Sequence, residues 1–124
     1  MYDKSLVIDG LREIEETLLH IIDRTSWIKT AADFTTTPHG VDILDVATIR
    51  LMAIGEEIKK IDKRTHGQLL IQYPTINWKD IMDMRNFIAH EYFRVDANVI
   101  FNTIQTRVQP LLTTIQQIIA GLIQ

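Results

Sequence analysis

The residues of this chain that could do chemistry gather in one segment, residues 85–94, which reads Arg-Asn-Phe-Ile-Ala-His-Glu-Tyr-Phe-Arg. The guanidinium of Arg85 can bind a phosphate through two parallel hydrogen bonds, and the imidazole of His90 can take or give a proton near neutral pH. On RNA, the 2′-hydroxyl can serve as nucleophile once it is deprotonated, and an arginine can neutralise the charge that grows on the phosphate. The segment therefore suits phosphodiester cleavage that needs no metal.

Helix geometry limits which of these side chains can meet. Asn86 and His90 are four residues apart, so on a helix they lie about 40° apart, and Asn86 could hold one imidazole nitrogen. Arg85 and His90 lie about 140° apart, so they converge only if the arginine wraps around, the helix bends or a second subunit completes the site. The alternative is that Arg85 pairs with a surface acid, Asp83 or Glu91, and that His90 is a cation near a helix C-terminus.

Metal and nucleotide sites of the common kinds are not predicted. The chain has no cysteine, which excludes a cysteine-ligated zinc, an iron–sulfur cluster and a cysteine nucleophile. His90-Glu91 begins like a zinc-protease helix, but Arg94 stands where the second histidine is required. Gly55 has no glycine-rich neighbours, so no phosphate loop is expected. We therefore expect neither a metal nor a cofactor.

Composition and charge indicate one ordinary globular domain, residues 1–124. The chain has 124 residues, of which 46% are hydrophobic and 23% charged, and its net charge is −3. Residues 1–62 hold 7 Lys/Arg and 12 Asp/Glu, a balance of −5, whereas residues 63–124 hold 6 and 4, a balance of +2. Without a basic stripe, bulk binding of nucleic acid and a DNA partner are not expected. The sequence shows no targeting segment and no membrane span, so we expect a cytoplasmic protein.

The spacing of apolar residues is helical nearly throughout. The first expected helix has an apolar stripe of Val7, Leu11, Ile14, Leu18 and Ile21. A short helical piece is expected from Ser26 to Phe34. The second long helix should begin with Thr37 as N-cap and Pro38 in the first position, and carries Val41, Leu44, Leu51, Ile54, Ile58 and Ile61, with Ala47 or Thr48 in the gap.

Two further helices complete the expected fold. The third begins near Thr75 or Asn77 and ends near residues 91–93. The last is capped by Asp96, and its stripe is Phe101, Ile104, Val108, Leu111, Ile115, Ile118 and Leu122, with Pro110 expected to kink it. Because no segment alternates with period two, the prediction is an all-α, antiparallel up-and-down bundle of about four main helices.

The last helix has an unusual surface, since Arg107 is the one charged residue between Ala97 and Gln124. A solvated helix of a bundle normally carries charges on its outer face. We therefore expect this helix either to be covered on most sides or to lie at a subunit interface.

The run from Asn77 to Tyr92 resembles the HEPN superfamily, and within it the HepT-like branch. The shared pattern is a tryptophan (Trp78), then Arg-Asn, four residues between the arginine and the histidine, and a tyrosine two residues after the histidine. Gly55-Glu56 resembles a Gly-Glu pair of that branch. The order of elements fits from the first helix to Pro110, so the resemblance covers nearly the whole chain.

One position departs from the family pattern, because Asn77 precedes the tryptophan where the family often has proline. Asparagine can also cap or start a helix, so this departure leaves the site intact. Trp78 itself is expected in the core more than as a platform for a base.

The resemblance implies a homodimer in which the motifs of two subunits face one cleft. It also implies a metal-independent endoribonuclease toxin, with an MntA-type nucleotidyltransferase antitoxin that silences it by transferring AMP onto Tyr92. The implied roles are phosphate binding for Arg85, acid–base catalysis for His90, and orientation of His90 or a phosphate contact for Asn86. Glu56 is a supporting candidate, with a surface position or a structural partnership with Arg85 as its other readings.

Two other functions stay open from the sequence. The chain could be a non-catalytic binding subunit of a minimal nucleotidyltransferase, although Arg85, His90 and Tyr92 together favour the enzyme. It could also be a plain dimeric structural bundle, in which changes at Arg85 or His90 would alter nothing but stability.

Overall fold

The computed structural model describes residues 2–89 and 95–124, and its elements are all helical in these ranges. The long helices are α1 (Lys4–Arg24), α2 (Pro38–Arg64) and α6 (Gln109–Leu122), and the short ones are α3 (Trp78–Met82), α4 (Met84–Ala89) and α5 (Ala97–Thr103). Two 3₁₀ turns, Ala31–Phe34 and Leu70–Gln72, and a π-helical segment, Ile104–Val108, complete the list. The all-α prediction is confirmed, with four main helical stretches.

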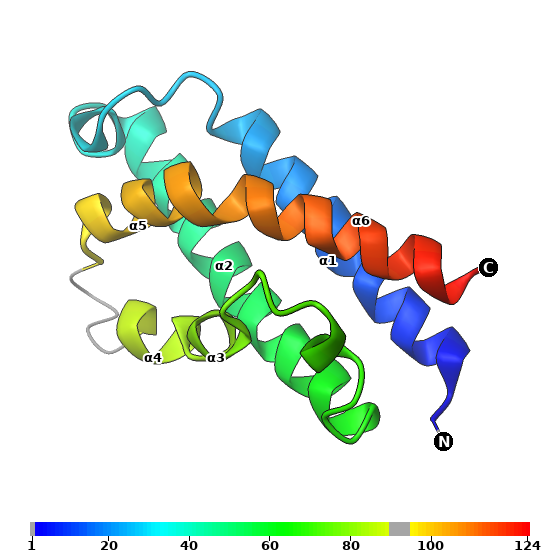
Figure 1. The fold of residues 1–124 in the computed structure, drawn as a ribbon. Coiled ribbons are helices and arrows are strands. Elements are labelled where there is room, and N and C mark those ends of the chain that lie inside the picture. The colour runs from blue at the N-terminus through cyan, green and yellow to red at the C-terminus, as the bar shows by residue number, and fades with distance from the viewer. Residues whose placement is uncertain (1, 90–94) are drawn as a thin grey trace.

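Helix α2 is central to the arrangement (Figure 1). It packs against α1 along one side and against α3 and α4 along another, while α6 lies along α1. Helices α1 and α2 are antiparallel, because the early residue Gly10 lies beside Ile61 and Ile14 lies with Ile54. Among the described residues no helix is long and apolar enough to cross a membrane.

The predicted start of α2 is confirmed in detail. Thr37 is its N-cap, and the side-chain oxygen of Thr37 accepts a hydrogen bond of 2.9 Å from the backbone N–H of Gly40. Pro38 occupies the first helical position, where its missing N–H costs nothing. The short piece expected from Ser26 to Phe34 is a turn followed by the 3₁₀ segment, which is shorter than predicted.

The apolar stripes form the core with few exceptions. Every predicted stripe residue of α1 is buried, as are the stripe residues of α2 from Leu44 onward, with both Ala47 and Thr48 filling the gap. Val41 was predicted in the core and is 42% exposed. The preceding residue, Gly40, is the one packed against the backbone of Asp33, and the next residue on a helix points about 100° away. Phe101, Ile104 and Leu122 are partly buried at the edge of the core.

The third predicted helix is interrupted, which corrects the expectation of one continuous element. Asn77 caps α3 by accepting a hydrogen bond from the N–H of Asp80, and the helix ends at Met82 with Asp83 as its C-cap. A new helix, α4, begins at Met84, and the N–H of Asn86 donates to the carbonyl of Asp83 at 2.8 Å. The predicted end near residues 91–93 lies outside the described residues.

The last predicted helix consists of three consecutive helical pieces. Asp96 caps α5 as predicted, since its carboxylate accepts a hydrogen bond of 2.9 Å from the N–H of Asn98. The π-helical segment ends immediately before α6, in which Pro110 is the second residue. Proline lacks the N–H that would continue the α-helical hydrogen bonds. The wider π-helical turns just before Pro110 are consistent with the predicted kink.

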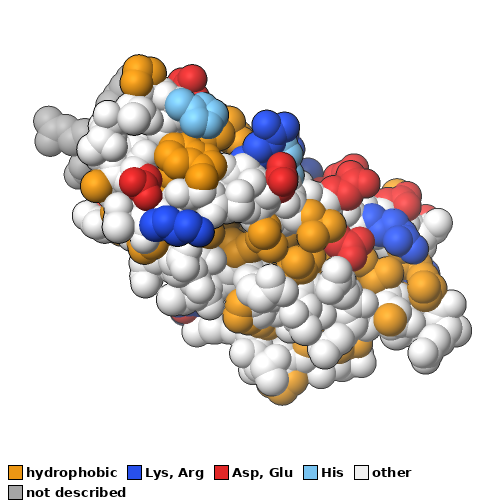
Figure 2. Space-filling model, turned by 90° about the horizontal axis from the view of Figure 1, so that it is seen from above, with side chains coloured by type: hydrophobic (Ala, Val, Ile, Leu, Met, Phe, Trp, Pro, Cys, Tyr) orange, Lys and Arg blue, Asp and Glu red, His pale blue; other side chains and the backbone are white. Residues whose placement is uncertain are grey.

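The uncharged surface of this C-terminal stretch is open on one side of the chain. Its exposed side chains include eight amides and hydroxyls, which are Asn98, Asn102, Gln105, Thr106, Gln109, Thr113, Gln116 and Gln117. The view from above shows charged side chains along one half of the molecule, and a mainly uncharged half on the side of α5 and α6 (Figure 2). The expectation that this helix is covered on most sides is therefore wrong for the single chain, and an interface role stays a prediction.

Candidate functional site

Gly55 lets α2 approach the junction of α3 and α4 closely. A Cβ atom at this position would lie 2.8 Å from the carbonyl oxygen of Ile81 and 3.7 Å from the Cβ of Met84. Real Cβ atoms do not come that near a backbone oxygen, so a side chain here would push the helices apart. The glycine of the Gly-Glu pair thus has a packing reason, and it brings the next residue, Glu56, beside α4.

Glu56 and Arg85 form an ion pair between α2 and α4. The distance from Arg85 Nη1 to Glu56 Oε1 is 3.8 Å, which is too long for a hydrogen bond. The two side chains are 59% and 42% exposed, respectively. Such an exposed pair stabilises a fold by at most about 1 kcal/mol, so the guanidinium can move to another anion at little cost.

The ion pair gives Arg85 a partner on α2. The arginine pairs with Glu56, as one reading of Glu56 proposed, and among the described residues no ion pair joins it to Asp83. Glu91, the other acid considered, lies outside the described residues. The Oε1 atom of Glu56 is itself buried, yet no described residue donates a hydrogen bond to it.

The remaining predicted site residues divide into two groups. Asn86 is exposed and follows Arg85 in the first turn of α4, so the two polar side chains leave the same short helix. His90 and Tyr92 lie outside the described residues, so the predicted contact of Asn86 with His90 stays a prediction. The structure thus brings together Arg85 and Glu56, and Asn86 follows Arg85 on α4.

Trp78 belongs to the core, as predicted. Its side chain is 9% exposed, and its indole N–H donates a hydrogen bond of 2.9 Å to the carbonyl of Tyr73. Two other histidines lie on or next to the long helices: His20 is half-buried on α1, and His66 is exposed in the turn after α2. His39 is also exposed, and its ring stacks on Trp27 with 5.2 Å between ring centroids.

One polar pair was not foreseen from the sequence. Arg107 donates from both terminal nitrogens to Asp80 Oδ2, at 3.3 Å each, and so joins the π-helical segment to α3. Met84, the neighbour of Arg85, lines a cavity of about 170 Å³ together with this pair. The available signal was the isolation of Arg107, because a lone charge on a long uncharged stretch often has a specific partner.

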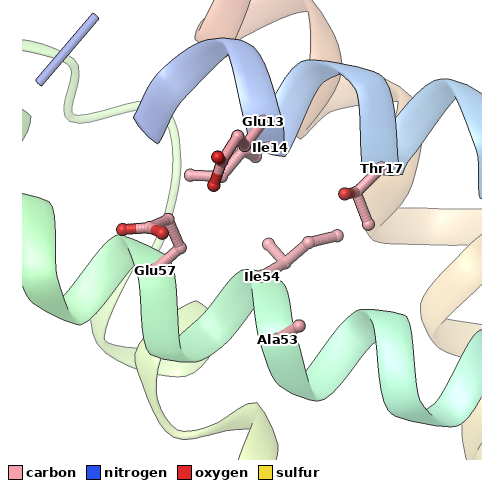
Figure 3. Close-up of a pocket in the computed structure, with 6 residues that line it drawn as sticks. All are labelled: Glu13, Ile14, Thr17, Ala53, Ile54 and Glu57. Carbon is pink, nitrogen blue, oxygen red and sulfur yellow. The ribbon is translucent and has the colours of Figure 1, made fainter. Parts of the chain in front are cut away.

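Two carboxylates face each other at a second place, between α1 and α2 (Figure 3). Glu13 and Glu57 line a cavity of about 100 Å³ with Thr17 and Ile54. A protein metal site usually needs at least three ligands, and no cluster of three or more potential ligands occurs among the described residues. This pair therefore gives no support for a metal centre.

Comparison with known proteins gives the family. The sequence model of the family described as "Ribonuclease HepT-like" matches residues 11–118. Two curated relatives are similar to part of the chain. "Putative RNase MJ0125" of Methanocaldococcus jannaschii is 34% identical over 77 residues, which are 61% of this chain and 63% of the relative. "Putative RNase TTE0752" of Caldanaerobacter subterraneus subsp. tengcongensis is 31% identical over 78 residues, which are 62% of this chain and 66% of the relative.

The matched part of the chain spans less than two thirds of the length of either relative. No solved structure matches the chain. The family match, by contrast, extends from the middle of α1 to near the end of α6 and includes Gly55, Glu56, Arg85 and Asn86. The chain therefore belongs to the HepT-like ribonuclease family.

Proposed function

We propose that this protein is an endoribonuclease that cleaves RNA without a metal ion, at a site built from Arg85, Asn86 and His90. Family membership supports RNA as the substrate, and so do the names of both curated relatives. The observation that carries the proposal is the state of Arg85. Its side chain is 59% exposed and, among the described residues, forms one ion pair, of 3.8 Å, so the guanidinium is accessible to a phosphate.

The proposed reaction is an attack within one RNA strand. His90 takes the proton of a 2′-hydroxyl, the 2′-oxygen attacks the adjacent phosphorus, and the bond from phosphorus to the 5′-oxygen breaks. The leaving 5′-oxygen then receives a proton from the same or a second histidine. Arg85 binds the phosphate oxygens and stabilises their growing negative charge, while Asn86 orients His90 or contacts the phosphate.

Glu56 acts in this proposal as a positioning residue. Its carboxylate sits beside Arg85 and limits the directions in which the guanidinium can point. We expect Glu56→Gln to raise KM several-fold with a smaller change in kcat, because the amide keeps the shape and loses the charge. An unchanged KM would show that Glu56 merely occupies the surface.

A homodimer gives the site its second half. On one helix Arg85 and His90 lie about 140° apart, so a contribution from another copy brings an arginine and a histidine to one phosphate. The proposed silencing by AMP transfer onto Tyr92 fits the same geometry. An added phosphate two residues from His90 places negative charge where Arg85 would bind the substrate. The proposed partner is an MntA-type nucleotidyltransferase antitoxin, and the chain is then the toxin of the pair.

The nuclease test uses protein made without an antitoxin and RNA in excess chelator. Wild type should cleave, whereas Arg85→Ala and His90→Ala should lose at least about 100-fold in rate, since each removes charge stabilisation or proton transfer. Arg24→Ala is a matched control, because Arg24 is 57% exposed and also pairs with an acid at 3.8 Å. It should cleave like wild type.

Each other outcome has a definite meaning. Cleavage that disappears on adding chelator would refute metal independence. Equal cleavage by wild type and both site variants would place the site elsewhere. No cleavage by wild type, with mass spectrometry showing Tyr92 unmodified, would favour the non-catalytic partner subunit of a nucleotidyltransferase.

The silencing step needs its own experiment. Incubation with an MntA-type nucleotidyltransferase and ATP should add AMP to wild type and abolish cleavage. Tyr92→Phe should stay unmodified and active under the same conditions. Modification of Tyr92→Phe at another residue would contradict the assignment of Tyr92.

A further inference from the structure

A cavity lies where α3 and α4 meet α5 and the π-helical segment (Figure 1). This α3–α5 cavity has a volume of about 170 Å³, and its ligand would meet Asp80, Ile81, Met84, Val99, Asn102 and Arg107. Cavities that hold drug-sized ligands have about 300–1,000 Å³. The smaller α3–α5 cavity therefore suits a single flat ring system, such as a nucleobase.

The inner wall of the α3–α5 cavity is apolar. Ile81 and Met84 belong to the core, with 2% of each exposed, whereas Val99 is 38% exposed on α5. The cavity therefore runs from the core to the surface between aliphatic side chains. Bases that leave a nucleic acid stack are held between apolar side chains in this way, while their polar edges need hydrogen-bond partners.

The rim of the cavity supplies such partners. Arg107 donates from both terminal nitrogens to Oδ2 of Asp80, at 3.3 Å each. A carboxylate offers about four acceptor positions, so Asp80 can accept further N–H groups. Asn102 is exposed and lines the same cavity, and its amide can both donate and accept. The rim thus combines an anionic acceptor with cationic and neutral donors.

The ion pair at the rim can open for a ligand. Both side chains are 45% exposed, and exposed ion pairs add little stability, so either partner can turn toward a ligand at small cost. Arg107 also belongs to the π-helical segment, and π-helical turns are frequent at functional sites. These features support a binding role for the pair in addition to its structural link between α3 and the π-helical segment.

Guanine fits the rim better than the other three RNA bases. Its Watson–Crick edge presents two adjacent N–H donors, from N1 and N2, followed by the acceptor O6. The carboxylate of Asp80 can accept both N–H groups, and Arg107 or Asn102 can donate to O6. Adenine and cytosine place a ring-nitrogen acceptor against the carboxylate, and uracil places a carbonyl oxygen there. An acceptor that faces an anion is repelled, so the rim selects against these bases.

We propose that the α3–α5 cavity binds one guanine base of the RNA, beside the phosphate that Arg85 binds. The inference rests on the nuclease of the proposed function and adds the base that it selects. Met84, which lines the cavity, directly precedes Arg85 on α4. An RNA strand that crosses α4 therefore meets the cavity and the guanidinium on one short helix. Base recognition at this place would select the position of the cut.

Mononucleotide binding tests the cavity without any cleavage. GMP, AMP, CMP and UMP carry the same phosphate, so differences in Kd between them report the base. GMP should bind at least about tenfold more tightly than the other three, because a hydrogen bond to a charged acceptor changes Kd by about tenfold or more. IMP, which lacks the 2-amino group, should bind more weakly than GMP. The backbone amide NMR signals of Val99 and Asn102 should shift when GMP is added.

Substitutions at the cavity test its location. Asp80→Asn keeps the shape of the side chain and removes its charge, so it should abolish the preference for GMP. Val99→Phe narrows the cavity and should weaken GMP binding, and circular dichroism checks that both variants stay helical. Asp23→Asn is the matched control, because Asp23 is also exposed and paired with an arginine, Arg24. It should bind like wild type. Arg85→Ala should weaken all four nucleotides alike and keep the preference for guanine.

The results separate this inference from the nuclease proposal. Equal Kd values for the four nucleotides, or no binding of GMP at millimolar concentration, would overturn base recognition. An unchanged preference in both Asp80→Asn and Val99→Phe would overturn the location. Sequencing of cleaved RNA should place a guanine at a fixed position beside the cut, and cuts without such a guanine would overturn the inference while leaving the nuclease intact. Selective GMP binding without cleavage by wild type would refute the nuclease alone.

Discussion

Gly55→Ala is the sharpest test of how α2 positions the site. The new Cβ would lie 2.8 Å from the carbonyl oxygen of Ile81, a backbone atom that cannot rotate away. Forcing extra volume into a packed contact costs about 1–3 kcal/mol, while alanine in place of glycine returns about 1 kcal/mol of helix propensity. The net expectation is a loss of up to about 2 kcal/mol in the free energy of unfolding.

Gly10→Ala provides the matched control in α1. Its Cβ would meet the side-chain end of Ile61 at 3.4 Å, which is an ordinary contact, so this variant should be neutral or more stable by up to about 1 kcal/mol. The propensity gain cancels between the two variants, which leaves a difference of about 1–3 kcal/mol. Urea unfolding followed by circular dichroism measures it. Equal stability of Gly55→Ala and Gly10→Ala would refute the close approach.

Three further predictions concern local interactions. Thr37→Ala should lower the free energy of unfolding by about 1 kcal/mol through loss of the α2 cap, whereas Thr37→Ser should not, and chemical denaturation distinguishes them. Trp78→Phe should cost about 1–3 kcal/mol in the same assay, because it leaves the carbonyl of Tyr73 without its indole donor. A double-mutant cycle on Asp80→Asn and Arg107→Gln should give a coupling below about 1 kcal/mol, since both side chains are 45% exposed; a coupling above 2 kcal/mol would contradict this.

The sequence predicts well those features that depend on neighbours along the chain. The caps Thr37 and Asp96 are local chemistry, because a short polar side chain accepts a hydrogen bond from an N–H two or three residues ahead. The apolar stripes of α1 and α6 follow from helical periodicity and one dominant direction of burial. Arg85 and Asn86 are also found this way, since a short motif carries them.

The features that the sequence misses depend on contacts between distant segments. The interruption at Asp83 falls where Ile81 and Met84 meet Gly55 of α2, and apolar spacing carries no signal for such a contact. The outward position of Val41 results from the packing of its neighbour Gly40 against the 3₁₀ segment. The pairing of Asp80 with Arg107 joins residues 27 positions apart, which periodicity cannot indicate.

The same helix, α2, links the packing of the fold to the proposed catalytic group. Gly55 sets the distance of α2 from the junction of α3 and α4, and Glu56, the next residue, pairs with Arg85. A second copy that covers Arg85 in the proposed homodimer would exclude water from the Glu56–Arg85 pair, and attraction between the pair grows as the local dielectric falls. Association would then orient the guanidinium more firmly than the exposed pair of a single chain can.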